Sequence, residues 1–352
     1  MQSFVHESRA CRVVFGRGAR QHLPRELDQL GLRRVLVLTT PEQVALGRQM
    51  ADLLGDRCVG VYGEAVMHVP ADVARAAVEA VHRAGGDGCV AVGGGSTIGL
   101  AKAIALNADL PIIALPTTYA GSEMTPLYAI TEGGLKHAGR DWRVAPRSVI
   151  YDPDLTLTLP QSLTMTSGMN AIAHAAEGLY ASDGNPVYSL MAEEGIRALA
   201  SALTCLKRAP TDADARGDAL YGAWLCATVL GNLQMGLHHK LCHTLGGSFN
   251  LPHAEVHTVM LPYALAYNAA SAPQAMARIA RALGRGPAPA GLRELGAALG
   301  VPRSLREIGM PAHGLDRAAD LVVQTPYPNP RPIERGQVRE LLQRAYEGAD
   351  PA

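Results

Sequence analysis

Histidines concentrate in one stretch of this 352-residue chain. Five of the twelve histidines lie within the segment 237-LHHKLCHTLGGSFNLPHAEVH-257, and His174 lies upstream of it. Imidazoles bind transition metals and exchange protons near neutral pH, so clustered histidines indicate a metal or proton-transfer site. A single helical histidine is more often structural, and the prediction therefore depends on the cluster.

The spacing in this stretch predicts which histidines face the same way. Leucines recur at every fourth position, at Leu233, Leu237, Leu241 and Leu245. This period predicts that a long helix over 213–246 ends at the Gly246-Gly247 pair. His239 and His243 are then one turn apart, whereas His238 points about 100° away at 3.6 residues per turn. We expect His239, not His238, to share a site with His243.

A second histidine pair follows in 253-HAEVH-257. Its spacing matches the zinc-protease motif, but Ala254 stands where that motif places its glutamate. The segment therefore predicts a histidine site and excludes this type of metalloprotease.

Charge and composition limit the class of protein. The chain has 32 basic and 32 acidic residues, so no excess positive charge exists to attract nucleic acid or a membrane surface. Its six cysteines contain no C-x-x-C pair, which is typical of reduced thiols in the cytoplasm. Glu7 and Arg9 stand where a signal peptide would be apolar, and no apolar run is long enough to span a membrane. We expect a cytoplasmic enzyme acting on a small molecule.

Strands and helices alternate in the first part of the chain. Continuous apolar strands are predicted over 34–40, 88–96 and 111–118, with helices between them, and a β-hairpin or an edge strand over 4–19. This alternation predicts an α/β domain with a mostly parallel, Rossmann-like sheet over 1–155. The strand signal then disappears, which predicts an all-helical domain over 156–352 that carries the histidines.

Small and polar residues follow the predicted buried strands. Gly93, Gly94, Gly95 and Ser96 end the second strand and open a helix, and Thr117-Thr118 end the third. Ligands of parallel sheets bind beyond the carboxyl ends of the strands, and free N–H groups at a helix N-terminus bind pyrophosphate. The glycine spacing differs from the G-x-G-x-x-G fingerprint. The segment predicts a different dinucleotide-binding turn.

These motifs together resemble the iron-containing alcohol dehydrogenase superfamily over essentially the whole chain, and within it the maleylacetate reductases. The resemblance rests on five segments: Gly93–Ser96, 117-TTYAGSEMT-125, Asp152-Pro153, 170-NAIAHAAEG-178 and 238-HHKLCHTLGGSFNLPH-253. It implies the dehydroquinate synthase-like fold of that superfamily.

The resemblance also implies roles for individual residues. The three metal-binding histidines of the superfamily correspond to His174, His239 and His253, and the histidine beside the nicotinamide corresponds to His243. Asn170 replaces the aspartate ligand of the metal-dependent members. A neutral amide binds a divalent ion weakly, so we expect catalysis by these five residues without a required metal.

The same resemblance implies the cofactor contacts. They correspond to Gly94, Gly95, Ser96, Thr117, Thr118 and Thr40, with His68 and Lys136 near the cofactor. Thr40 replaces the acid that binds the ribose and repels a 2′-phosphate in NAD-specific relatives. We therefore expect NADH to be used and NADPH to be tolerated. Gly99 stands where many alcohol dehydrogenases have an aspartate.

The reaction implied is reduction of the conjugated C=C bond of maleylacetate to 3-oxoadipate, in the degradation of aromatic compounds. An enone already has an electron sink, so hydrogen bonds from imidazoles can stabilise the enolate without a cation. Lys240, Arg140 and Arg143 are candidates for binding the two substrate carboxylates, or else lie in solvent. We expect a homodimer, with 4–19 as a possible edge for strand exchange.

Three alternatives remain open from the sequence. Asn170 could still bind a metal in an alcohol or polyol dehydrogenase. The fold would also suit a lyase like dehydroquinate synthase, which uses NAD only transiently. A nucleotide-binding protein without catalysis would give no reason for the clustered histidines.

Overall fold

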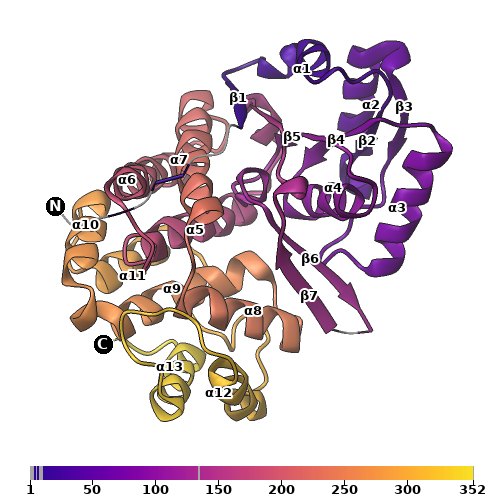
Figure 1. The fold of residues 1–352 in the computed structure, drawn as a ribbon. Helices are drawn as coiled ribbons and strands as arrows, with labels where there is room; N and C mark the ends of the chain where they lie inside the picture. The colour runs from indigo at the N-terminus through magenta and orange to yellow at the C-terminus, as the bar shows by residue number, and fades with distance from the viewer. Residues whose placement is uncertain (1–3, 5, 8–10, 134, 352) are drawn as a thin grey trace. The chain divides into compact units, whose positions relative to one another are not determined.

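The computed structural model describes residues 4, 6–7, 11–133 and 135–351 (Figure 1). The chain forms two compact units, which divide between Leu159 and Pro160. Residues 8–159 make the first unit, and residues 160–352 make the second together with the N-terminal residues up to Glu7. The division lies close to the expected boundary at residue 155.

The first unit is built on a parallel six-stranded sheet. Its strand order is β1-β8-β5-β4-β2-β3, and every neighbouring pair is parallel. The strands are β1 Arg12–Phe15, β2 Val35–Leu38, β3 Cys58–Tyr62, β4 Gly88–Gly93, β5 Ile112–Pro116 and β8 Ser148–Tyr151. Strands β2, β4, β5 and β8 are completely buried, which explains their continuous apolar sequences. The predicted parallel sheet is confirmed.

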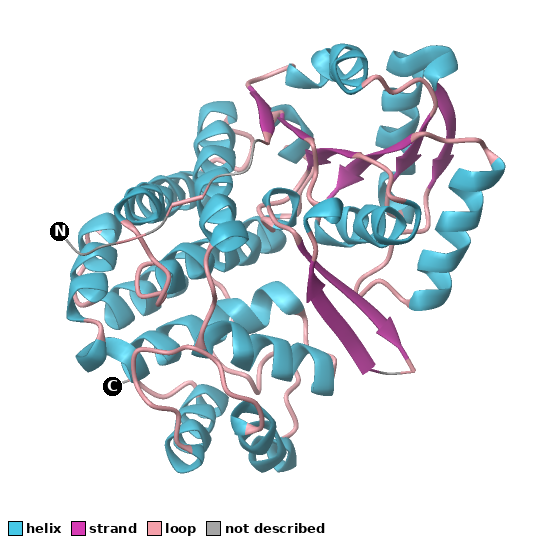
Figure 2. Ribbon diagram, in the orientation of Figure 1, coloured by secondary structure: helices cyan, strands magenta, loops and turns pink. Residues whose placement is uncertain are grey.

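Helices cover both faces of this sheet (Figure 2). They are α1 Leu23–Leu30, α2 Val44–Leu54, α3 Ala71–Arg83 and α4 Gly95–Ala108. Leu27 of α1 and Met50 of α2 pack in one apolar cluster with Val37 and Val92 of the sheet. Helix α4 begins two residues after β4 and is buried along its middle, from Thr97 to Ala105 apart from Gly99, so the glycine turn is held by a packed core.

Two expectations for this unit were incomplete. The described part of 4–19 contains β1, an edge strand paired in parallel with β8, and not a hairpin. A hairpin does occur later, between β6 Leu127–Glu132 and β7 Leu135–Arg140, where we predicted no strands. Its strands form a separate two-stranded sheet, so they lack the apolar run of a buried strand.

The second unit is helical throughout its described part, as predicted (Figure 1). Its helices are α5 Gln161–Gly178, α6 Pro186–Arg208, α7 Ala213–Asn232, α8 Leu237–Phe249, α9 His253–Asn268, α10 Pro273–Leu283, α11 Ala288–Leu299, α12 Leu315–Val323 and α13 Arg335–Glu347. Helix α5 is buried from Thr164 to Gly178 and packs against α6, α7 and α9. Residues 303–307 form turns and not the helix we expected. No helix in the described residues is long and apolar enough to span a membrane.

The predicted continuous helix over 213–246 is wrong. Helix α7 ends at Asn232, Leu233 is extended, and α8 begins at Leu237. Helix α8 then continues through Gly246-Gly247 and ends at Asn250, which adopts a left-handed conformation. The break lies within the leucine period because side chains from distant segments bond the first N–H groups of α8, as described below.

A buried lysine connects α4 to the segment that precedes the β6–β7 hairpin. The Lys102 ammonium donates hydrogen bonds to the backbone oxygen of Thr125 at 2.9 Å, to its hydroxyl at 2.9 Å and to the backbone oxygen of Leu127 at 2.7 Å. Burial lowers the pKa of Lys102 from 10.5 to about 7, and the nearby carboxyl of Glu123 acts in the opposite direction.

We predict that Lys102 makes stability depend on pH. Between about pH 7 and 10.5 the unfolded chain holds a proton that the folded chain has lost, so the free energy of unfolding rises with pH in this window. In denaturant unfolding, the free energy of unfolding of wild type relative to that of Lys102→Met should increase by about 1.4 kcal/mol per pH unit in this window. The control is Lys207→Met, at an exposed residue of α6, for which the difference from wild type should not increase with pH. Equal slopes for all three proteins would contradict the prediction.

Candidate active site

The turn between β4 and α4 is shaped for close approach to its backbone. None of Gly93, Gly94 and Gly95 has a positive φ, so their backbone conformation does not require glycine. A Cβ on Gly94 would lie 2.7 Å from the side chain of Thr118, whereas a Cβ on Gly95 would meet only Ala120 at 3.7 Å. Side chains are thus excluded at Gly94 by packing, while Gly95 leaves an open N-terminal turn of α4 that suits a pyrophosphate.

The carboxyl ends of three strands meet around this turn. The Gln43 amide, in the short helix that follows β2, donates to the Thr117 hydroxyl after β5 at 3.0 Å. Thr40 precedes Gln43 and places a neutral side chain at the end of β2. The structure therefore brings Gly94, Thr117 and Thr118 together, and adds Gln43, which no sequence motif indicated.

The loop after β3 also packs against α4, at Gly99. His68 and Val69 both have positive φ values, of 67° and 46°, which are strained conformations for residues other than glycine. A Cβ on Gly99 would lie 2.8 Å from the Val69 side chain, so this packing accounts for the glycine. Thr131 bonds the His68 carbonyl at 2.8 Å and pairs with Lys136 across the hairpin. The side chain of Lys136 lies outside the described part of the structure.

In the second unit, one face of α5 carries three polar residues. Asn170, His174 and Glu177 follow each other at intervals of one turn, and all three are buried, with exposures of 1–2%. The Oδ1 atom of Asn170 has no hydrogen-bond partner. This apolar helix therefore brings a carboxylate, an imidazole and an amide into the interior of the unit.

Glu177 holds the start of α8. Its carboxylate accepts the backbone N–H groups of His238 at 2.8 Å and His239 at 3.2 Å, and it also contacts Nδ1 of His239. The Asn329 side chain accepts the N–H of Leu237 at 3.3 Å. These three N–H groups have no partner within the helix, so Glu177 and Asn329 decide where α8 begins.

The same carboxylate sets the protonation pattern of the neighbouring imidazoles. In the tautomer of a neutral His239 that donates from Nδ1 to the Glu177 carboxylate, Nε2 presents its lone pair. Nε2 lies 3.0 Å from Nδ1 of His174, and His174 is therefore the donor in that bond. A directed chain runs from His174 through His239 to Glu177.

His238 points to a different set of groups. Its Nε2 lies 3.1 Å from Nδ1 of His257 and 3.6 Å from Sγ of Cys242. Burial holds the pKa values of His238 and His257 well below the usual range, and repulsion among neighbouring imidazoles acts in the same direction. Burial also raises the pKa of the Cys242 thiol. These side chains are neutral at pH 7.

His257 lies close both to the pair His174 and His239 and to the pair His238 and Cys242. One nitrogen from each of His174, His239 and His257 lies within 4.8 Å of the others, and so do the donor atoms of His238, Cys242 and His257. His253 is partly exposed, with its ring 4.4 Å from that of His257. His243 is exposed, with its ring 6.0 Å from that of His239.

The cluster thus contains all four histidines selected from the sequence, and three residues that were not selected. His174 and His239 are in direct contact, His253 and His243 lie at its border, and the roles of all four stay predictions. Glu177 was missed, His238 was set aside in favour of His239, and His257 was noted only as the partner of His253 in a pair. The position of Glu177, one turn after His174, is a signal that could have found it.

The basic residues considered for substrate binding have other partners. Lys240 donates to the Thr325 hydroxyl at 2.9 Å, and Arg143 forms a two-pronged ion pair with Asp141. The Arg140 guanidinium lies 5.7 Å from the Trp142 ring. These contacts leave the proposed binding of the substrate carboxylates a prediction.

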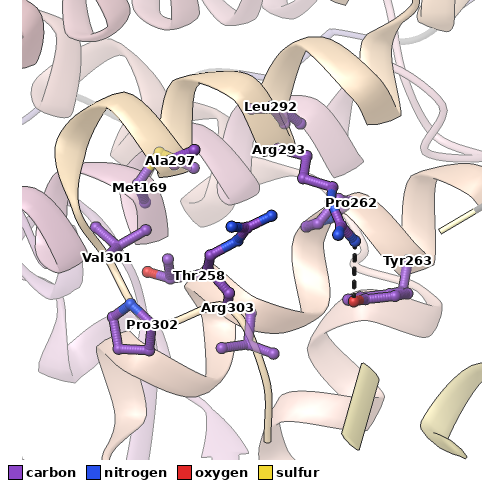
Figure 3. A pocket seen from close by; sticks show the side chains of 12 residues that line it. Met169, Thr258, Pro262, Tyr263, Leu292, Arg293, Ala297, Val301, Pro302 and Arg303 are labelled. Atoms are coloured by element: carbon purple, nitrogen blue, oxygen red, sulfur yellow. Dashed lines mark hydrogen bonds between the residues drawn. The ribbon is translucent and has the colours of Figure 1, made fainter. Parts of the chain in front are cut away.

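A cavity in the helical unit lies beside α9 and α11 (Figure 3). Its volume is about 30 Å³, and Thr258, Tyr263 and Arg293 are among its lining residues. This volume holds about one or two water molecules, so the cavity is too small for the substrate.

The three imidazoles of His174, His239 and His257 fit a divalent transition metal by number and reach. Glu177 would orient His239 as carboxylates orient zinc-bound histidines. The unpartnered Oδ1 of Asn170 lies one turn away on α5 and adds no charge. The residues therefore fit an ion geometrically, with no anionic ligand among them.

Comparison with known proteins identifies the family. The model of the family described as iron-containing alcohol dehydrogenase matches residues 10–153, and that of the C-terminal part of the Fe-containing alcohol dehydrogenase family matches residues 164–346. The chain belongs to the iron-containing alcohol dehydrogenase family.

Within this family the chain is similar to maleylacetate reductases. It is 62% identical to the maleylacetate reductase of Burkholderia cepacia over 352 residues, with 100% of both chains covered, and 54% identical to that of Sphingobium indicum over 348 residues, with 99% of both covered. The crystal structure of maleylacetate reductase from Agrobacterium tumefaciens superimposes with a TM-score of 0.96, at 52% identity and full coverage of both chains.

We predict that Glu177→Gln lowers kcat about 10- to 100-fold, the usual effect of removing a partner that orients an active histidine. The amide can no longer accept from every donor that now faces the carboxylate. Steady-state kinetics with NADH and maleylacetate measure the loss, and KM for NADH should change little. Asp183→Asn is the matched control, because Asp183 accepts the N–H of Gln234 just before α8 without touching a histidine. Wild-type kcat in Glu177→Gln would refute the role.

Proposed function

We propose that this protein is a maleylacetate reductase that uses NADH, and tolerates NADPH, to reduce the conjugated C=C bond of maleylacetate to 3-oxoadipate. One observation carries the proposal. The buried cluster contains three imidazoles within reach of a common ion, and Asn170 stands where the resemblance implies an anionic ligand in the metal-dependent relatives. The names of the similar full-length relatives support the same substrate. Such an enzyme serves the degradation of aromatic compounds.

The reaction needs little help from a metal ion. When bound, NADH would supply a hydride for the alkene carbon that is β to the ketone. The electron pair of the alkene moves to the ketone oxygen, and the resulting enolate takes one proton at carbon. The protein must therefore stabilise a developing negative oxygen and deliver one proton.

The histidines divide these tasks according to their exposure. His243 is exposed on α8 and can exchange protons with solvent, so we assign it proton delivery. His174 and His239 are buried in the chain that ends at Glu177, where a proton added to one ring is stabilised by the carboxylate. His253, at the border of the cluster, is a further hydrogen-bond donor to the substrate.

The metal question follows from the donor set. An ion held by His174, His239 and His257 would supply a Lewis acid that polarises the ketone. The family name indicates iron, whereas Asn170 supplies no negative charge at the position that the resemblance assigns to an aspartate ligand. We propose that the reductase does not require this ion.

The cofactor proposal rests on the first unit. The open N-terminal turn of α4 at Gly95 and Ser96, with Thr117 and Thr118 beside it, suits the pyrophosphate. Thr40, the second residue after β2, has no charge of its own to repel a 2′-phosphate, and its side chain bonds the carboxylate of Glu42. His68 and Lys136 are kept as candidates for further cofactor contacts.

We predict rapid loss of NADH absorbance when chelator-treated, dialysed protein meets maleylacetate, because the enone supplies its own electron sink. Asn170→Asp should retain more iron or zinc after the same dialysis, measured by elemental analysis, because it adds an anionic ligand. Activity that returns only with added iron or zinc would overturn the metal-free proposal and favour a metal-dependent alcohol dehydrogenase. A lyase would consume no net NADH.

We predict that Gly95→Ala raises KM for NADH about tenfold, a cost of about 1.4 kcal/mol in binding. The added methyl group fits the folded chain but lies where the pyrophosphate approaches the backbone. The thermal midpoint should stay near that of wild type. Gly286→Ala, which also adds a methyl group in open space, is the matched control for KM. An unchanged KM in Gly95→Ala would place the pyrophosphate elsewhere.

A further inference from the structure

A second group of metal-binding side chains lies next to the proposed active histidines. His238 and Cys242 are one turn apart on α8, and His257 faces them from α9. Their exposures are 0%, 1% and 0%. The contacts within this group leave out His174, Asn170 and the carboxylate of Glu177.

Two of the three separations between the donor atoms match those around a tetrahedral ion, and the third is at most 4.8 Å. With metal–nitrogen bonds of about 2.05 Å and a metal–sulfur bond of about 2.3 Å, tetrahedral angles place two nitrogens about 3.3 Å apart and a nitrogen and a sulfur about 3.6 Å apart. The observed distances from Nε2 of His238 are 3.1 Å to Nδ1 of His257 and 3.6 Å to Sγ of Cys242. Movements of a few tenths of an ångström would therefore bring both distances from Nε2 of His238 to their tetrahedral values.

Hydrogen bonds alone leave some polar atoms of this group without partners. Nε2 of a neutral His238 has either one proton or one lone pair, yet it faces both Nδ1 of His257 and Sγ of Cys242. Nε2 of His257 has no hydrogen-bond partner, which is costly in the interior. A cation would use the lone pairs of both rings and the sulfur at once.

Charge also favours this group over the imidazole group that faces Asn170. A thiol that binds a metal becomes a thiolate, so Cys242 supplies the anionic ligand that Asn170 does not. The step is balanced: the S–H bond breaks, a metal–sulfur bond forms, and the proton leaves to solvent. Mixed nitrogen and sulfur ligands suit zinc and cobalt(II).

We propose that His238, Cys242 and His257 form a binding site for a borderline or soft divalent ion such as zinc, and that its occupation inhibits the enzyme. Inhibition follows because the His257 ring packs against those of His174 and His239, with centroids 5.8 Å and 5.1 Å away. An ion on the Cys242 side draws the His257 ring toward itself and so disturbs the two rings that take part in the proposed reaction. The inhibitory part rests on the proposed reductase function, whereas the binding part does not.

The binding test uses cobalt(II) and the full-length, chelator-treated protein. Wild type should develop the near-ultraviolet charge-transfer band of a thiolate bound to cobalt, and Cys242→Ser should lose it. Cys226→Ser is the matched control, because Cys226 is equally buried but lies on α7, and it should keep the band. His174→Ala should also keep it, since His174 is no ligand of this site. Circular dichroism verifies that each variant is folded.

The inhibition test adds zinc during NADH and maleylacetate turnover. Wild type and Cys226→Ser should lose activity, and Cys242→Ser should need at least about tenfold more zinc for the same loss. No band in wild type, or a band that survives in Cys242→Ser, overturns the site. A band without zinc inhibition overturns the inhibitory role alone. Absence of turnover in metal-free wild type refutes the proposed function, while the cobalt band still reports on the site.

Discussion

The arrangement of the histidines depends on one buried carboxylate. Glu177 is 1% exposed, and a carboxylate removed from water is stable only if donors surround it. It finds them in the N–H groups of His238 and His239 and in the imidazole of His239. Together with Asn329, which accepts the N–H of Leu237, Glu177 thus sets the start of α8, and it orients the imidazole of His239.

The start of α8 then determines which neighbours each histidine meets. Adjacent residues on a helix point about 100° apart, so His238 and His239 enter different surroundings. His239 joins His174, and His238 joins Cys242 and His257. The sequence argument that only one of the two could share a face with His243 was correct, but it treated the other as irrelevant. His238 instead helps to build a second donor group whose chemistry differs from the first because it contains sulfur.

Much of the fold follows from patterns that act over short distances. Continuous apolar strands between helices predicted the parallel sheet because its strands are buried on both faces. Errors arose where distant partners decide. The leucine period predicted one helix through Leu233, but Glu177 and Asn329 supply hydrogen bonds that allow α8 to begin at Leu237. The β6–β7 hairpin lies apart from the buried sheet and lacks its apolar signal.

By itself, the sequence determined the α/β and helical units, the glycine turn before α4 and the stretch that concentrates histidines. These features depend on residue type and local period, which the chain carries in order. Only the tertiary structure decided which imidazoles touch, because helix rotation and the positions of α5, α8 and α9 set those contacts. Glu177 is separated from His238 by 61 positions, and His257 joins two groups through space. Hydrogen bonds between such distant residues form only after packing brings their helices together.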